Sequence, residues 1–252
     1  MAPTGATGRR AIRAEGRGTG WCNYLHLCRV SNLPTVWTNV LAAVVLSGTG
    51  FTLSRYLLLA GALSCFYAGG MCLNDLWDAA VDRVDNPGRP IPSGRVSVGG
   101  ARALTVVLLL SGLGGLALVP QLPALAAGAV LLLVIVLYDR YHRDCSWSVL
   151  LMAACRFLVF VVAGLGASGG LEGAVLWAGA LQFLYVLVLS LVARWEKLRQ
   201  RGYGFPVIPW MLAGVSLVDG LVLAALAAPV WLLAGVGGAV ATLAGQRYVR
   251  GD

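Results

Sequence analysis

Apolar stretches recur along the chain, separated by short segments that are charged or rich in glycine and proline. Each stretch is close to the roughly 20 residues that a helix needs to cross a hydrocarbon layer about 30 Å thick. None shows the alternating pattern of a membrane barrel strand, so every span is predicted to be a helix. The expected helices cover residues 33–50, 56–74, 102–119, 122–138, 148–168, 173–193, 207–228 and 230–247.

The composition supports a chain whose main solvent is lipid. Hydrophobic residues make up 58% of the 252 and charged residues only 12%, against roughly 45–50% and about 25% in a soluble domain. We therefore expect an all-α integral membrane protein with about eight transmembrane helices. Long charged loops follow the second and sixth spans, which hints at two four-helix halves.

Apart from Arg156, positive charge lies in loops, tails and the ends of spans, although the formal net charge reaches +8. It forms no basic stripe interleaved with aromatic residues, so nucleic acid is not an expected partner. Residues 1–24 are expected to be a disordered basic tail, and residues 25–252 a single polytopic membrane domain.

The loops that carry Lys and Arg all fall on one side of the predicted helix order, and the opposite loops hold almost only Arg55. Basic loops face the cytoplasm in most membrane proteins. The protein is therefore expected to be a multi-pass protein of the cell membrane with both termini in the cytoplasm.

Four polar residues at the end of the second span, Asn74, Asp75, Asp78 and Asp82, share one face of a helix. Carboxylates grouped there repel one another and are costly at the end of a membrane span, so a functional role is the default interpretation. Hard cations such as Mg²⁺ prefer oxygen ligands and are usually shared with substrate phosphates. The run therefore favours a magnesium site.

A rigid, basic loop follows directly at residues 85–95. Its prolines and glycines predict turns, and Arg89 and Arg95 can each bind phosphate oxygens through two parallel hydrogen bonds. Acidic metal ligands beside phosphate-binding arginines are what a magnesium diphosphate requires. The alternative is a solvated helix end whose aspartates pair with Arg83 and Arg89.

Residues 74–94 resemble the UbiA superfamily of intramembrane prenyltransferases, whose signature is NDxxDxxxD followed by a loop N-x-P-x-R-P-[IL]-x-S-G. The stretch 29–39 and the Cys155-Arg156 pair look like the EboC-like branch, whose members accompany secondary metabolism. The resemblance implies a central cavity open to the cytoplasmic side. It also implies Mg²⁺, a prenyl diphosphate of the farnesyl or geranylgeranyl class, and a small lipophilic acceptor that is typically aromatic.

The resemblance also implies roles for individual residues. Asp75, Asp78 and Asp82 would be catalytic and, with Asn74, would bind the metal. The cavity would include Asn39 and Trp77, although packing is the alternative role for Trp77. Arg89 and Arg95 would bind the diphosphate. Three further basic residues are candidates from their own charge and position rather than from the resemblance, namely Arg156, Arg194 and Lys197.

The sequence departs from the family where a second aspartate motif is expected, at the end of the sixth span. Residues 191–199 hold one acid and three bases there. One hypothesis is that Arg194 and Lys197 replace a second metal ion, and the alternative is that they only enforce orientation. Asp139, Asp144 and His142, in the loop after the fourth span, are not expected to replace the lost motif.

Other buried polar residues have two interpretations. Arg156 and Asp219, each near the middle of a span, can pair with each other, or Arg156 can bind diphosphate. Asn39 and Gln182 can line the cavity or hydrogen-bond between helices. For the whole protein, prenyl transfer is the expected function, with a terpene cyclase or a non-catalytic isoprenoid-diphosphate binding or transport protein as alternatives.

Overall fold

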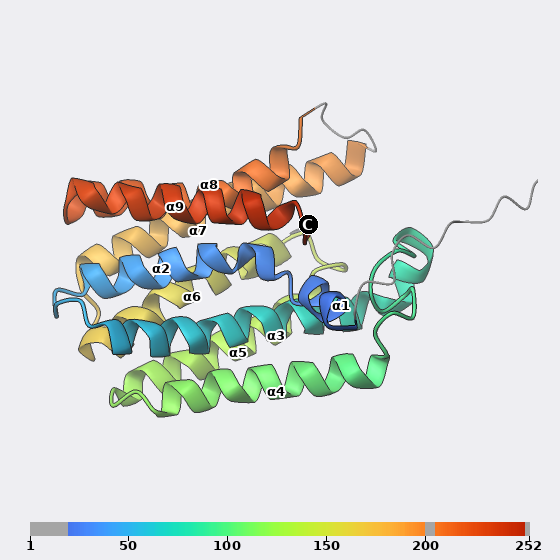
Figure 1. Ribbon diagram of the computed structural model, residues 1–252, viewed down its shortest axis with the longest axis horizontal. Helices are drawn as coiled ribbons and strands as arrows, with labels where there is room; N and C mark the ends of the chain where they lie inside the picture. The colour runs from blue at the N-terminus through green and yellow to red at the C-terminus, as the bar shows by residue number, and fades with distance from the viewer. Residues whose placement is uncertain (1–19, 200–204, 250–252) are drawn as a thin grey trace, which may run out of the picture.

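The computed structural model describes residues 20–199 and 205–249, and these form a bundle of helices (Figure 1). No strand occurs in these two ranges. The helices are α1 (Gly20–Leu27), α2 (Leu33–Leu46), α3 (Leu53–Asp85), α4 (Val98–Ala117), α5 (Leu122–Tyr141), α6 (Ser148–Ser168), α7 (Gly173–Arg199), α8 (Val207–Leu226) and α9 (Leu232–Gln246), with short 3₁₀ turns at Val30–Asn32 and Pro229–Trp231.

Seven of the helices in the described ranges are long and apolar enough to span a membrane, and α2 with its preceding turn forms a shorter apolar segment, Val30–Leu46. Large apolar side chains such as Leu110, Trp177 and Leu233 are exposed on the outer faces. These faces suit lipid rather than water. The protein is therefore an all-α, multi-pass membrane protein, as expected, while the two four-helix halves remain a prediction.

Three predicted boundaries are wrong. The α3 helix runs eleven residues beyond the predicted 56–74 span to Asp85, and it stops where Pro87 disfavours a helical Asn86. The α2 helix ends at Leu46 rather than residue 50, because Gly48 and Gly50 adopt positive φ angles of 72° and 77°. Helix α1 starts at Gly20, within the predicted disordered tail, whose residues 1–19 lie outside the described ranges.

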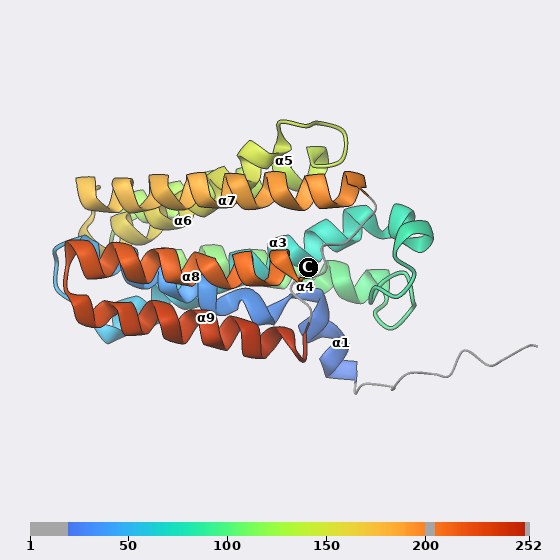
Figure 2. The same cartoon turned by 90° about the horizontal axis from the view of Figure 1, so that it is seen from above.

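Helix α2 occupies the interior of the bundle and packs against α3, α6, α7, α8 and α9. Neighbours in sequence also pair, and Figure 2 shows α8 and α9 side by side as the contacts require. Figure 1 shows α1, the α3–α4 loop and the end of α9 at the same end of the bundle. The described parts of these three basic segments therefore lie at one end of the bundle.

Candidate functional site

The carboxylates of Asp75, Asp78 and Asp82 lie on the inward face of α3 near its C-terminal end. Their residues are only 5%, 5% and 1% exposed. Three- and four-residue spacings place them in successive turns on one side of the helix, as the sequence predicted. Because all three are buried, this part of α3 is not solvated, although its aspartates do pair with Arg89, as that alternative also predicted.

Arg89, in the loop after α3, binds all three acids. Its Nη1 atom lies 2.6 Å from Asp82 Oδ2, 3.5 Å from Asp75 Oδ1 and 3.8 Å from Asp78 Oδ2. Arg95 instead points back into the loop, where it donates to the Gly88 carbonyl, and its side chain is exposed. The structure therefore brings Arg89 to the acids and leaves Arg95 as a brace of the loop.

The loop between α5 and α6 supplies two further cationic or polar groups. Arg143 donates to Asp78 Oδ1, and its Nη2 atom lies 3.6 Å from Asp82 Oδ1. His142 Nε2 is hydrogen-bonded to Asp78 Oδ2 at 3.3 Å, and this bond raises the pKa of His142 above its ordinary value despite partial burial. The α5–α6 loop therefore contributes to the acidic cluster, while the expectation that Asp139, Asp144 and His142 do not replace the lost motif stays a prediction.

Arg29 reaches the same cluster from the segment between α1 and α2. Its Nη2 atom lies 3.4 Å from Asp75 Oδ1, and its backbone is left-handed with φ of 46°. Three guanidinium groups thus surround three buried carboxylates. Buried charges are tolerated only when they are paired, and here each buried carboxylate has at least one guanidinium partner.

The acids fit Mg²⁺ in donor type, because the ion prefers carboxylate oxygens. Within the described ranges, no three His, Cys, Asp or Glu side chains are grouped tightly enough to hold a metal ion as they stand. The three acids instead surround Arg89 Nη1 at distances of 2.6 to 3.8 Å. A position at which three carboxylates already approach one cation is a suitable place for a divalent ion.

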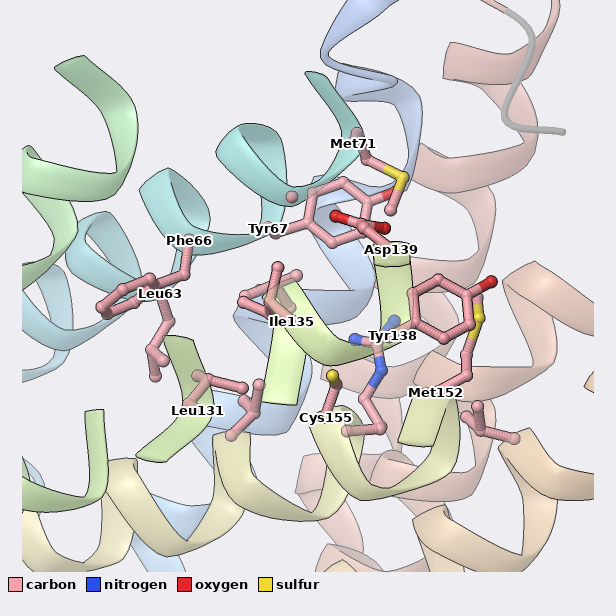
Figure 3. A pocket seen from close by; sticks show the side chains of 15 residues that line it. Leu63, Phe66, Tyr67, Met71, Leu131, Ile135, Tyr138, Asp139, Met152 and Cys155 are labelled. Carbon is pink, nitrogen blue, oxygen red and sulfur yellow. The ribbon is translucent and has the colours of Figure 1, made fainter. Parts of the chain in front are cut away.

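An apolar cavity of about 100 Å³ adjoins this cluster (Figure 3). Residues of α2, α3, α5, α6 and α7 line it, including Leu63, Phe66, Ile135 and Val186. Asn74 Nδ2, from the acidic run, donates to Asp139 Oδ1 at 3.2 Å, and Asp139 itself lines the cavity. This hydrogen bond links the charged cluster directly to the apolar space.

Arg156 also lines the cavity but does not reach the aspartates of α3. Its Nη1 donates to Asn39 Oδ1 at 2.7 Å, and Asn39 Nδ2 donates to Asp219 Oδ2 at 2.7 Å. Gln182 Nε2 donates to the other oxygen of Asp219 at 2.7 Å. Asn39 therefore bridges the expected Arg156–Asp219 pair, and both Asn39 and Gln182 connect helices.

Two other predicted residues lie away from the cavity. Trp77 is 45% exposed on the outer side of α3 and is not part of the cavity wall. Arg194, on α7, donates to the Ser146 carbonyl at 3.1 Å, so it braces the α5–α6 loop. The side chain of Lys197 lies outside the described part of the chain.

A family model described as the UbiA prenyltransferase family matches residues 33–246. The match covers most of the chain and includes the acidic run and the basic loop. The chain belongs to the UbiA prenyltransferase family. This confirms the family resemblance, while the EboC-like branch remains a prediction.

Curated relatives within the UbiA family include digeranylgeranylglyceryl phosphate synthases. The protein from Sulfolobus acidocaldarius is 30% identical over 176 residues, which cover 69% of this chain and 62% of that protein. The one from Methanoculleus marisnigri is 33% identical over 150 residues, covering 58% and 53%. The chain thus spans about half to three fifths of the length of these relatives.

Solved UbiA structures share the fold. A UbiA homologue from Archaeoglobus fulgidus bound to DMAPP and Mg²⁺ has a TM-score of 0.59 and 17% identity, over 86% of each chain. A structure from work on digeranylgeranylglyceryl phosphate synthase in membranes has a TM-score of 0.61 and 17% identity, over 92% of this chain and 96% of that one. At these identities the likeness concerns the fold.

Sequence reasoning missed Arg29, Arg143 and His142 as members of the cluster, and it gave no positive role to Asp139. The available signal was the dense polar run at the end of α5, where Asp139 to Arg143 contains five consecutive polar or aromatic residues after an apolar span. The ionisable groups from Asp139 to Arg143 lie at the end of a span, like those of α3, and the same functional interpretation applies to them.

Proposed function

We propose that the protein transfers a prenyl group from an isoprenoid diphosphate of the farnesyl or geranylgeranyl class to a lipophilic acceptor within the membrane. The main supporting observation is that a buried cluster of three acids and three arginines lies next to an apolar cavity. The Asn74–Asp139 hydrogen bond connects the two. A prenyl diphosphate has a matching charged head and apolar tail.

In this proposal Arg29, Arg89 and Arg143 turn from the carboxylates to the diphosphate oxygens, with Arg95 closing the basic loop. Guanidinium groups suit this task because they bind phosphate oxygens in pairs. Asp75, Asp78 and Asp82, with Asn74 beside them, would hold Mg²⁺, which when bound neutralises the diphosphate and makes it a better leaving group.

The apolar wall excludes water from the prenyl chain and favours attack by the acceptor over hydrolysis. Arg156 adds one positive charge to this wall and, in the proposal, faces the diphosphate from the cavity side. We further propose that Arg194 and Lys197 stand in for a second metal, so that activity requires one Mg²⁺ per site. A magnesium titration that finds two required ions would contradict this part.

The names of the curated relatives support a geranylgeranyl donor and, for those proteins, a product with two geranylgeranyl groups on glyceryl phosphate. We propose the same donor class for this chain. The substrate that receives the prenyl group is then either geranylgeranylglyceryl phosphate or, as the sequence led us to expect, an aromatic compound. We also propose that both termini and the charged site lie on the cytoplasmic side.

Product analysis tests the proposal. Purified protein in lipid vesicles is incubated with Mg²⁺ and farnesyl or geranylgeranyl diphosphate, with geranylgeranylglyceryl phosphate or an alkylphenol as acceptor. A product with the combined mass of acceptor and prenyl group is expected. A cyclised hydrocarbon instead would indicate a terpene cyclase, and a diphosphate that stays intact with both acceptors would indicate a binding or transport protein.

A further inference from the structure

Asp139 is the acidic side chain in the wall of the cavity, among the residues that the structure describes. The residue is 3% exposed, at the C-terminal end of α5. Figure 3 shows it at the same end of the cavity as Tyr67 and Met71, with Leu63 and Leu131 toward the other end. The cavity is therefore polar at the end nearest the acidic cluster and apolar beyond it.

The two carboxyl oxygens of Asp139 differ. Oδ1 accepts a hydrogen bond from Asn74 at 3.2 Å, which fixes the orientation of the group. Oδ2 is buried and has no hydrogen-bond partner in the protein. Buried polar atoms are nearly always paired, and an unpaired one is costly, so an unpaired oxygen on a residue of the cavity wall indicates a missing partner.

The missing partner of Asp139 Oδ2 must be a hydrogen-bond donor that can enter an apolar cavity at low cost. Arg156 lines the same cavity, so a cationic donor such as an ammonium group would meet a like charge there. A hydroxyl group is neutral and donates one hydrogen bond, which matches the one unpaired oxygen. Glyceryl and phenolic hydroxyls share this chemistry.

We propose that Asp139 Oδ2 accepts a hydrogen bond from a hydroxyl group of the substrate that receives the prenyl group. Asp139 would thereby select hydroxylated substrates for this role. This inference rests on the proposed function, since it assigns the acceptor class of that site. Asn74 is the neighbour of Asp75 and donates to Asp139, so the hydroxyl would be held beside the carboxylates that would hold the magnesium of the diphosphate. Asp139 is thus an acceptor-binding residue that fixes specificity.

Equilibrium binding to the full chain in vesicles tests this without requiring turnover. The probes are geranylgeranylglyceryl phosphate and an alkylphenol, each compared with its O-methyl ether, which cannot donate. The wild type should bind the free hydroxyl of at least one pair about 10- to 150-fold more tightly than the ether, the range for a hydrogen bond to a charged group. The pair that shows the preference identifies the glyceryl or the phenolic source.

Asp139→Asn preserves an oxygen for Asn74 but presents an amide to the cavity, which can donate to an ether. This variant should lose the preference for hydroxyl, and Asp139→Leu should bind hydroxyl and ether within about twofold of each other. Asp144→Asn makes the same change at an exposed acid outside the cavity wall, so it is the matched control and should keep the wild-type ratio. Magnesium-dependent binding of geranylgeranyl diphosphate reports whether each variant is folded.

Equal binding of hydroxyl and ether forms by the wild type in both pairs would overturn the inference, as would an Asp139→Asn variant that keeps the wild-type ratio. Failure of the proposed function gives a different pattern, namely intact diphosphate with every acceptor while the hydroxyl preference persists. The two failures are therefore distinguishable.

Discussion

Arg140 and Arg143 lie three residues apart at the end of α5, but their surroundings differ. The Arg143 side chain is 30% exposed and contacts the buried Asp78 and Asp82. The Arg140 side chain is 55% exposed and pairs with Asp144 at 3.4 Å, whose own side chain is 67% exposed. Exposed pairs of this kind contribute little, whereas a cation beside buried acids is part of the anion site.

Replacing each of these arginines with methionine separates the two roles. Arg143→Met should weaken binding of geranylgeranyl diphosphate by about tenfold or more, because it removes charged hydrogen bonds from a buried site. Arg140→Met should change it by less than about twofold. Titration with the radiolabelled diphosphate measures the affinity of each variant. Equal affinities in the two variants would show that Arg143 does not bind the diphosphate.

Single residues were predictable where the sequence repeats a helical spacing or, as with Arg89, places a charge close by along the chain. Asp75, Asp78 and Asp82 follow that spacing, so one face was expected and found. Arg29 and Arg143 reach the same face from segments 46 and 65 residues away from their partners, and only the packing of α1 and α5 against α3 brings them there. Local pattern carries no information about such distant approaches.

Helices α8 and α9 form a pair whose backbones touch at glycines. A Cβ atom at Gly235 would lie 2.6 Å from the Gly220 Cα and 2.7 Å from the Ser216 carbonyl oxygen. One at Gly237, half a turn along the same helix, would meet nothing within 4 Å. Small residues at helix contacts permit this close approach in membranes.

The same substitution at these two glycines should therefore have opposite effects. Gly235→Ala should lower the free energy of unfolding by about 1–3 kcal/mol, because the backbones must separate. Gly237→Ala should be neutral or stabilising by up to about 1 kcal/mol, since alanine favours helix. Unfolding in detergent micelles measures both, and an unchanged stability for Gly235→Ala would refute the close contact.

Helices were predictable as elements because apolar span length is a strong signal, but their ends were not. The last part of α3 carries too many charged residues to be predicted as a membrane span, although the first residue that disfavours a helix is Pro87. Burial of its acids against Arg29, Arg89 and Arg143 stabilises this extension. The α2 helix was overestimated for the converse reason, because Gly48 and Gly50 end it within an apolar stretch.

At the scale of the molecule, one end of the bundle holds the acidic cluster, its basic loops and the end of α9 (Figure 1). If this end faces the cytoplasm, the opposite loops face outward. Tyr248 is 82% exposed near the end of α9, and Glu172 is exposed in the α6–α7 loop. These two positions report the orientation of the whole bundle.

Labelling of intact cells with a membrane-impermeant maleimide tests the orientation. Glu172→Cys should be labelled, and Tyr248→Cys should be labelled only after the membrane is permeabilised, because the charged end is expected in the cytoplasm. The parent chain, with its own cysteines, gives the background. Labelling of Tyr248→Cys in intact cells would show that the protein has the opposite orientation in the membrane.

The central claim is that the acids of α3 hold Mg²⁺ for a prenyl diphosphate. Its most direct test is the affinity for geranylgeranyl diphosphate with and without Mg²⁺, in the wild type, Asp78→Asn and the exposed control Asp144→Asn. The account predicts that Mg²⁺ tightens binding in the wild type and in Asp144→Asn, and that Asp78→Asn loses this gain. Binding that ignores Mg²⁺, or an Asp78→Asn variant that responds like the wild type, would contradict it.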